Sequence, residues 1–148
     1  IKVLFICHGN ICRSPMAEYV MKDMKKKANL SDQFYIASAA TSTEEIGNPV
    51  HQGTRVKLAQ AGIACEGHHA RQMTGRIMTG MYLIGMDEWN IRNIKRITGG
   101  DPEGKIFKMM SFSGSSRDVA DPWYTGDFEA TWKDVTEGCQ GLLEYILK

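Results

Sequence analysis

Short apolar runs alternate along this chain with longer segments in which apolar residues recur every three or four positions. The short runs predict strands at residues 1–6, 34–38, 81–86 and 105–109. The longer segments predict helices at residues 15–27, 49–60, 88–97 and 128–147, the second starting at the break Asn48-Pro49. Residues 111–120, rich in Ser, Gly, Arg and Asp, are expected to form a loop. This alternation is typical of an α/β fold, here a single-domain parallel sheet with helices on both faces.

Composition fits one soluble domain over residues 1–148. The chain has 43% hydrophobic and 24% charged residues, and its net charge of +1 provides no general attraction to nucleic acid or to a membrane surface. No apolar stretch approaches the length of a membrane span, and the first strand begins without a signal-peptide pattern, so a cytoplasmic location is expected. The 4 cysteines are too few to stabilise the chain through disulfides, and a reducing compartment would keep them as thiols.

A thiol and a guanidinium follow the first strand closely. Cys7 stands where that strand should end, and Arg13 comes just before the first helix. In α/β folds this position holds anions, because backbone N–H groups and the helix N-terminus point toward the ligand. We therefore expect a phosphate-binding loop between the first strand and the first helix, with phosphate contacts from His8, Gly9, Asn10, Ile11, Cys12, Arg13 and Ser14.

The residue types in this loop suit transfer of a phosphoryl group to sulfur. A Cys7 thiolate would attack phosphorus, and the planar fork of Arg13 matches two phosphoryl oxygens. Gly9 allows the backbone to approach the anion, and Asn10 tolerates the left-handed conformation that a tight loop often requires. Ser14 is expected to donate its hydroxyl to the thiolate, or else to cap the first helix without a catalytic role.

A proton donor for the leaving oxygen is expected from the C-terminal part of the chain. Asp121 precedes Pro122, which biases Asp121 toward extended backbone, and Trp123 and Tyr124 follow it. Their aromatic rings would contact an aryl phosphate. The alternative is an Asp-Pro turn whose rings pack on the core, because Asp101 also precedes a proline.

The segment from Cys7 to Ser14, continuing into Pro15-Met16-Ala17-Glu18, closely resembles the signature of the low-molecular-weight protein tyrosine phosphatases. Four further segments resemble that family in the same order: Ser38-Ala39-Ala40, Glu45-Ile46-Gly47-Asn48-Pro49, His68-His69-Ala70-Arg71-Gln72 and Asp121-Pro122-Trp123-Tyr124. The resemblance spans nearly the entire chain. It implies hydrolysis of phosphotyrosine in a protein or peptide, without a metal or other cofactor. Phosphate or vanadate is expected to inhibit competitively.

The resemblance also implies individual roles. Cys7 is the nucleophile of a phosphocysteine intermediate, Arg13 is the phosphate clamp, and Ser14 is the hydrogen-bond partner of the thiolate. Asp121 acts first as acid and then as base. Cys12 matches a second loop cysteine that can bond to the nucleophile and shield it from irreversible oxidation.

Two further groups of residues follow from the resemblance. Asn10 is held by a serine and a histidine that correspond to Ser38 and His68, with His69 as the alternative. The expected substrate cleft contains Ile11, Glu44, Trp123 and Tyr124. Glu44 stands where many relatives carry an aromatic residue, so the rim of the cleft is expected to be acidic and to disfavour acidic residues beside the phosphotyrosine.

Three other functions use similar residues. A thiol-dependent arsenate reductase resembles this fold and loop, but its chemistry needs a pair of relay cysteines in the middle of the chain, and residues 80–100 contain none. A phosphotyrosine-binding module would need neither Cys7 nor Asp121. A zinc site would have to be built from Cys7, His8, Cys12, His68 and His69. Its metal ion would lie beside the cationic Arg13, which would repel it.

Overall fold

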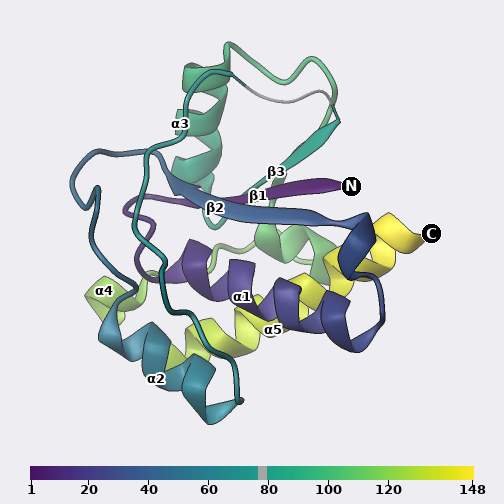
Figure 1. Cartoon of the computed structure of the whole chain (residues 1–148). Coiled ribbons are helices and arrows are strands. Elements are labelled where there is room, and N and C mark those ends of the chain that lie inside the picture. Colours follow the sequence, from purple (N-terminus) through teal and green to yellow (C-terminus); the bar gives the residue numbers. More distant parts are fainter. Residues whose placement is uncertain (77–79) are drawn as a thin grey trace.

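A four-stranded parallel sheet forms the centre of the computed structural model, which describes residues 1–76 and 80–148 (Figure 1). Its strands are β1 (Lys2–Cys7), β2 (Tyr35–Ala40), β3 (Met81–Gly85) and β4 (Ile106–Lys108). They lie in the order β2-β1-β3-β4, and every neighbouring pair is parallel. The carboxyl ends of all strands therefore meet at one edge, and the chain leaves β1 where the strand order reverses, the position at which open α/β sheets bind ligands.

Helices cover both faces of the sheet, as the sequence predicts. In Figure 1, α3 lies on one face, and α1 and α5 lie on the other with α2 beside them. The helices are α1 (Arg13–Lys27), α2 (Gln52–Gln60), α3 (Glu88–Thr98), α4 (Pro122–Thr125) and α5 (Phe128–Leu147), with 3-10 turns η1 (Ser31–Gln33) and η2 (Met109–Ser113).

Alternating side chains of β1 supply two separate cores. Val3 and Phe5 are buried among residues of α1 and α5. Leu4 and Ile6 point to the opposite face, where Ile94 of α3 packs in the second core. An uninterrupted apolar run such as residues 3–7 of β1 is typical of a sheet covered on both faces, because successive side chains point to opposite sides.

The predicted strands and long helices are confirmed, with shifted ends. Helix α2 begins at Gln52 rather than at Pro49, because the His51 side chain caps it by accepting a hydrogen bond from the backbone of Gly53. Three short elements are absent from the prediction, the first being the turn η1 before β2. The others are η2, which shortens the expected loop over residues 111–120, and α4, a single turn that Asp121 caps.

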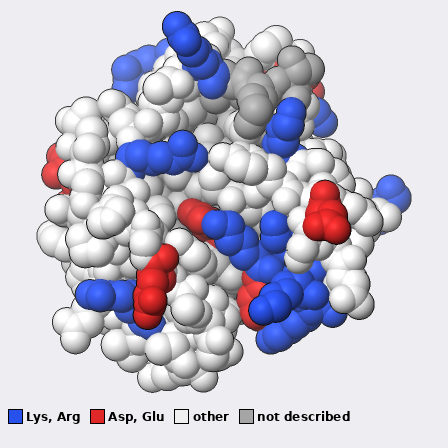
Figure 2. Space-filling model, viewed as in Figure 1, with Lys and Arg blue, Asp and Glu red and all other residues white. Residues whose placement is uncertain are grey.

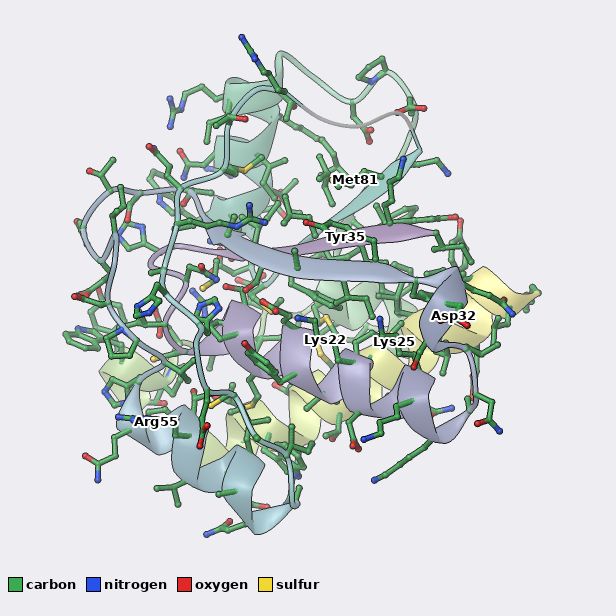
Figure 3. All side chains as sticks on the ribbon, viewed as in Figure 1. Lys22, Lys25, Asp32, Tyr35, Arg55 and Met81 are labelled. Carbon is green, nitrogen blue, oxygen red and sulfur yellow. The ribbon has the colours of Figure 1, made fainter. Side chains whose placement is uncertain are left out.

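Basic residues gather over the C-terminal half of α1 on the face shown in Figure 2. Lys22 and Lys25 lie on this helix beside the β2 edge of the sheet (Figure 3). Lys22 pairs with Glu18 at 2.5 Å, and Lys25 donates to the Phe34 carbonyl at 3.1 Å. These lysines therefore serve the local structure of α1. Within the described part of the chain, no helix has the length and apolar character needed to cross a membrane.

Candidate active site

The Cys7–Ser14 loop joins β1 to α1 at the carboxyl edge of the sheet. Cys7 is the last residue of β1, and Arg13 and Ser14 are the first two residues of α1. Asn10 has a φ of 59°, in the left-handed region that asparagine tolerates better than most residues. The turn at Asn10 folds the loop back over the thiol of Cys7.

Two groups of the loop contact the Cys7 sulfur. Ser14 Oγ lies 3.0 Å from Cys7 Sγ, and the backbone N–H of Asn10 donates to the same sulfur at 3.3 Å. Cys7 is only 3% exposed, and the Ser14 hydroxyl that contacts its sulfur belongs to the first turn of α1. A buried sulfur with two polar neighbours in a loop that opens a helix suits a nucleophilic cysteine.

Asn10 connects the loop to the neighbouring strand. Its amide nitrogen donates to Ser14 Oγ at 2.8 Å and to Ser38 Oγ at 2.9 Å, and its amide oxygen accepts from the Arg71 backbone at 3.2 Å. His68 Nε2 donates to the Asn10 carbonyl at 3.1 Å. The Asn10 side chain is fully buried, and its bonds to Ser14 and Ser38 are sheltered from water, whereas the contacts with Arg71 and His68 are partly buried. The structure thus brings Ser38 and His68 to Asn10.

His69 lies apart from this network. It is exposed, and its Nδ1 atom lies 3.1 Å from the carbonyl oxygen of Gly47. Of the two neighbouring histidines, His68 is therefore the one beside the Cys7–Ser14 loop.

Glu18 extends the network and was not predicted as a site residue. Ser38 Oγ donates to Glu18 Oε1 at 2.5 Å, and His68 Nδ1 lies 3.8 Å from the same oxygen. A continuous chain of polar groups thereby runs from Glu18 through Ser38, Asn10 and Ser14 to the Cys7 sulfur. The position of Glu18 in the sequence could have indicated this role, because Glu18 follows Ser14 by one helical turn and lies on the same face of α1.

Arg13 is held in place from three sides. One guanidinium nitrogen donates to Asp87 Oδ2 at 2.7 Å and to the Val119 carbonyl at 3.0 Å, and the other lies 3.4 Å from Asp121 Oδ2. Burial works against the charge, but the negative charges of Cys7, Asp87 and Asp121 outweigh it and raise the pKa of Arg13. The guanidinium therefore stays charged inside the protein.

Asp87 is a second residue that the sequence analysis missed. It directly follows β3 and caps α3, and its other oxygen accepts from the Asn90 backbone at 2.7 Å. The signal was its place after a strand that neighbours β1, because parallel neighbours end at the same edge.

Asp121 lies opposite the loop, at the start of α4. Its Oδ1 atom accepts from the Trp123 backbone at 3.0 Å, and its Oδ2 atom faces Arg13. Pro122 occupies the first position of this turn and Gly126 ends it in the left-handed conformation. The Asp-Pro sequence therefore acts as a cap that aims the carboxyl group toward the guanidinium of Arg13.

One cavity of about 100 Å³ joins these groups. Glu44 lies at its rim with 68% of its side chain exposed, and its carboxylate lies 2.9 Å from His8 Nε2. Trp123 is 58% exposed and Tyr124 is 83% exposed. The cavity is lined by Cys7, His8, Gly9, Ile11, Cys12, Arg13, Glu44, Glu45, Asp121, Trp123 and Tyr124, so it contains every residue of the expected catalytic set and cleft.

Cys12 shares the cavity with Cys7 but lies in a different environment. Burial, and then the nearby charges of Cys7 and Asp121, raise the pKa of the Cys12 thiol from its ordinary value of 9.0 to about 12. Cys12 is thus protonated at neutral pH and is no competing nucleophile. In residues 1–76 and 80–148, no group of three or more His, Cys, Asp or Glu side chains is arranged to hold a metal ion.

Comparison with known proteins gives one consistent result. The family model described as "Low molecular weight phosphotyrosine protein phosphatase" matches residues 2–148. The chain is 38% identical to the low molecular weight protein-tyrosine-phosphatase YfkJ of Bacillus subtilis, over 100% of this chain and 97% of that protein. It is 37% identical to the protein PtpA of Staphylococcus saprophyticus, over 100% of this chain and 95% of that protein.

Solved structures agree with the sequence matches. The crystal structure of YfkJ from Bacillus subtilis superimposes with a TM-score of 0.94, covering 99% of this chain and 94% of that one. The low molecular weight protein tyrosine phosphatase SP-PTP from Streptococcus pyogenes is 41% identical, with a TM-score of 0.87 and coverage of 99% and 93%. Sequence, fold and site geometry lead to the same conclusion, and the chain belongs to the low molecular weight phosphotyrosine protein phosphatase family.

Proposed function

We propose that this protein hydrolyses phosphotyrosine, and aryl phosphate monoesters generally, through a phosphocysteine intermediate on Cys7. The observation that carries the proposal is the single cavity lined by a buried thiol, a charged guanidinium and a carboxyl group. Such a set supplies a nucleophile, a clamp for the phosphoryl oxygens and a proton donor.

In the first step, the Cys7 thiolate attacks phosphorus. A sulfur–phosphorus bond forms while the bond between phosphorus and the phenolic oxygen breaks. Asp121 donates its proton to that oxygen, and the phenol leaves neutral. Arg13 holds the equatorial oxygens, on which negative charge is concentrated, together with backbone N–H groups of the Cys7–Ser14 loop, of which that of Asn10 points at the Cys7 sulfur.

In the second step, water attacks the phosphocysteine. Asp121, now a carboxylate, takes a proton from this water, and the sulfur–phosphorus bond breaks to release inorganic phosphate. The departing thiolate regains the hydrogen bonds from Ser14 and the Asn10 backbone, whose distances of 3.0 and 3.3 Å to the sulfur support this role. The same oxyanion site is expected to bind phosphate or vanadate in competition with substrate.

We assign the rim of the cavity to substrate selection. Ile11, Trp123 and Tyr124 offer apolar surface for the phosphotyrosyl ring, and they line the cavity together with Glu44 and Glu45. The two carboxylates on one side of the opening would repel acidic residues next to the phosphotyrosine of a protein or peptide.

The proposal is tested by two variants and a series of aryl phosphates. Cys7→Ser should abolish turnover, while the matched change Cys65→Ser should leave it intact. Asp121→Asn should lower kcat/KM for phenyl phosphate by about 10²-fold or more, and for p-nitrophenyl phosphate by much less, because a good leaving group needs little protonation. Asp32→Asn, on the exposed turn η1, is the control.

Three results would contradict the proposal. Turnover by the Cys7→Ser variant would exclude Cys7 as the nucleophile. An equal loss of kcat/KM for both substrates in Asp121→Asn would exclude Asp121 as the general acid. Thiol-coupled reduction of arsenate by the unaltered protein would favour the reductase chemistry instead, although Cys139 is fully buried and Cys65 is half-buried on a separate segment.

A further inference from the structure

His51 lies between the Cys7–Ser14 loop and helix α2, and the mechanism above gives it no role. Its backbone N–H donates to the Ile11 carbonyl at 2.8 Å. Its Nδ1 atom accepts from the Gly53 backbone at 3.0 Å, so the neutral ring carries its proton on Nε2. These two bonds fix both the position of the residue and the orientation of its ring.

The ring of His51 packs against two aromatic residues from the C-terminal part of the chain. It stacks on Phe128 with ring centroids 5.2 Å apart and an interplanar angle of 18°. It meets Trp123 edge-on, at 5.8 Å and 79°. A Cβ atom at Gly53 would lie 2.4 Å from the Phe128 ring, so glycine is required there for this approach. In Figure 1, α2 and α4 accordingly lie at the same end of the molecule.

Trp123 connects this aromatic group to Asp121. The Trp123 backbone N–H donates to Asp121 Oδ1 at 3.0 Å, which fixes the carboxyl group at the start of α4. Helix α4 has only 4 residues, and a single turn of helix is not stable by itself. Trp123 is largely exposed, so its ring contact with His51 adds to the restraint that the buried Pro122 and Arg13 place on the Asp121 segment.

We propose that His51 is a positioning residue that holds Trp123, and through it the carboxyl group of Asp121, in register with the Cys7–Ser14 loop. The backbone hydrogen bond of His51 to Ile11 connects it to the loop that contains Cys7. The His51 ring contacts Trp123, next to Asp121. The inference rests on the proposed function, in which Asp121 protonates the leaving oxygen.

Three substitutions separate the two interactions of the His51 side chain, the hydrogen bond to Gly53 and the ring contacts. His51→Asn keeps an acceptor for the Gly53 N–H but removes the aromatic ring. His51→Phe keeps a ring against Trp123 and Phe128 but removes the acceptor. His51→Ala removes both.

The readout is kcat/KM for phenyl phosphate and p-nitrophenyl phosphate, since this ratio reports the step in which the phenol leaves. We expect His51→Ala and His51→Asn to lose about three- to ten-fold on phenyl phosphate, the range of an aromatic contact, and less than about two-fold on p-nitrophenyl phosphate. His51→Phe should keep most activity on both. Thermal unfolding of each variant, followed by circular dichroism, monitors the helical cap separately.

The outcome that would overturn the inference is an equal loss on both substrates in His51→Ala and His51→Asn, with no recovery in His51→Phe. His51 would then serve only the cap of α2. Asp121→Asn is measured in the same series. A leaving-group effect in Asp121→Asn without one in the His51 variants defeats this inference alone, whereas its absence in Asp121→Asn defeats the proposed acid as well.

Discussion

The Cys7–Ser14 loop and the rim of the cavity next to it are built in opposite ways. In the loop, Asn10 and Ser14 are completely buried and are joined by hydrogen bonds to each other and to Ser38. At the rim, Glu44 and Tyr124 are mostly exposed, and the Glu44 carboxylate pairs with His8, whose side chain is itself 43% exposed.

In the function proposed above, this difference would separate catalysis, in the loop, from substrate selection, at the rim. A buried polar group that loses its partner costs free energy, so a change in the loop should reduce stability and turnover together. An exposed ion pair contributes little to stability, so a change at the rim should affect substrate choice alone. The following variants test this division from the loop outward.

Arg13→Lys should have the largest effect. Lysine carries one ammonium group in place of the planar fork, so it cannot hold two phosphoryl oxygens while also bonding Asp87 and the Val119 carbonyl. We expect kcat/KM for p-nitrophenyl phosphate to fall by about 10²- to 10³-fold. The control Arg117→Lys changes an exposed arginine that pairs with Asp134. A loss of Arg13→Lys activity no greater than that of this control would refute the clamp.

Asn10→Ala should reduce both stability and activity. It removes the bonds to Ser14, Ser38 and the Arg71 backbone, and we expect the free energy of unfolding in urea to fall by about 1–3 kcal/mol. The same loss of loop order should lower kcat by about 10-fold or more.

Asn29→Ala provides a matched control for Asn10→Ala. Asn29 has nearly the same left-handed backbone, with a φ of 58°, but it is exposed at the end of α1. It therefore carries the backbone strain without the buried bonds. Equal effects of the two substitutions would show that strain, and not the hydrogen-bond network, accounts for the loss at Asn10.

Cys12 tests whether burial inside the loop raises the pKa of a thiol and thereby makes stability depend on pH. Its pKa is raised from 9.0 to about 12 in the folded protein, so its contribution to stability is complete below pH 9 and is lost as the pH rises toward 12. The difference in unfolding free energy between wild type and Cys12→Ala should be constant from pH 6 to 8 and should fall by about 2 kcal/mol by pH 11. A difference that stays constant up to pH 11 would contradict the buried, protonated thiol.

Glu44→Gln should have the smallest effect. Removing this charge should raise kcat/KM by about two- to five-fold for phosphotyrosyl peptides with acidic neighbours, and should leave thermal stability unchanged. The effect should disappear at high salt, because exposed charges are screened. Glu144→Gln, in the last turn of α5, is the matched control. If peptides with acidic, neutral and basic neighbours all respond alike, the rim does not select by charge.

Local sequence signals were sufficient for much of the fold. Apolar runs located all four strands, because a sheet covered on both faces requires continuous apolar residues. The loop after β1 was also evident, since Cys7, Asn10 and Arg13 stand between a predicted strand and a predicted helix. Asparagine also tolerates the left-handed conformation that such a loop requires. Ends of elements were less predictable. The start of α2 depends on a histidine side chain acting as a cap, a role more typical of Ser, Thr, Asp or Asn.

Partners from distant parts of the chain could not be read from spacing. Asp87 bonds Arg13 across 74 positions of sequence, and the Thr54 hydroxyl donates to the Cys12 carbonyl across 42. Each residue looks ordinary in its own segment, and only the packing of β3 and α2 against the loop gives it a role. His51 was missed for the same reason, because its contacts cross between elements. Glu18 differs, because its spacing from Ser14 on α1 did give a signal.

The most direct test of the account is the identity of the phosphorylated residue during turnover. Asp121→Asn should slow hydrolysis of the intermediate while p-nitrophenyl phosphate still phosphorylates the enzyme. After a rapid acid quench, mass spectrometry of peptides should find one added phosphoryl group on Cys7, and none in the double variant with Cys7→Ser. A phosphoryl group on any other residue, or an unmodified enzyme that has released a burst of p-nitrophenol, would contradict nucleophilic catalysis by Cys7.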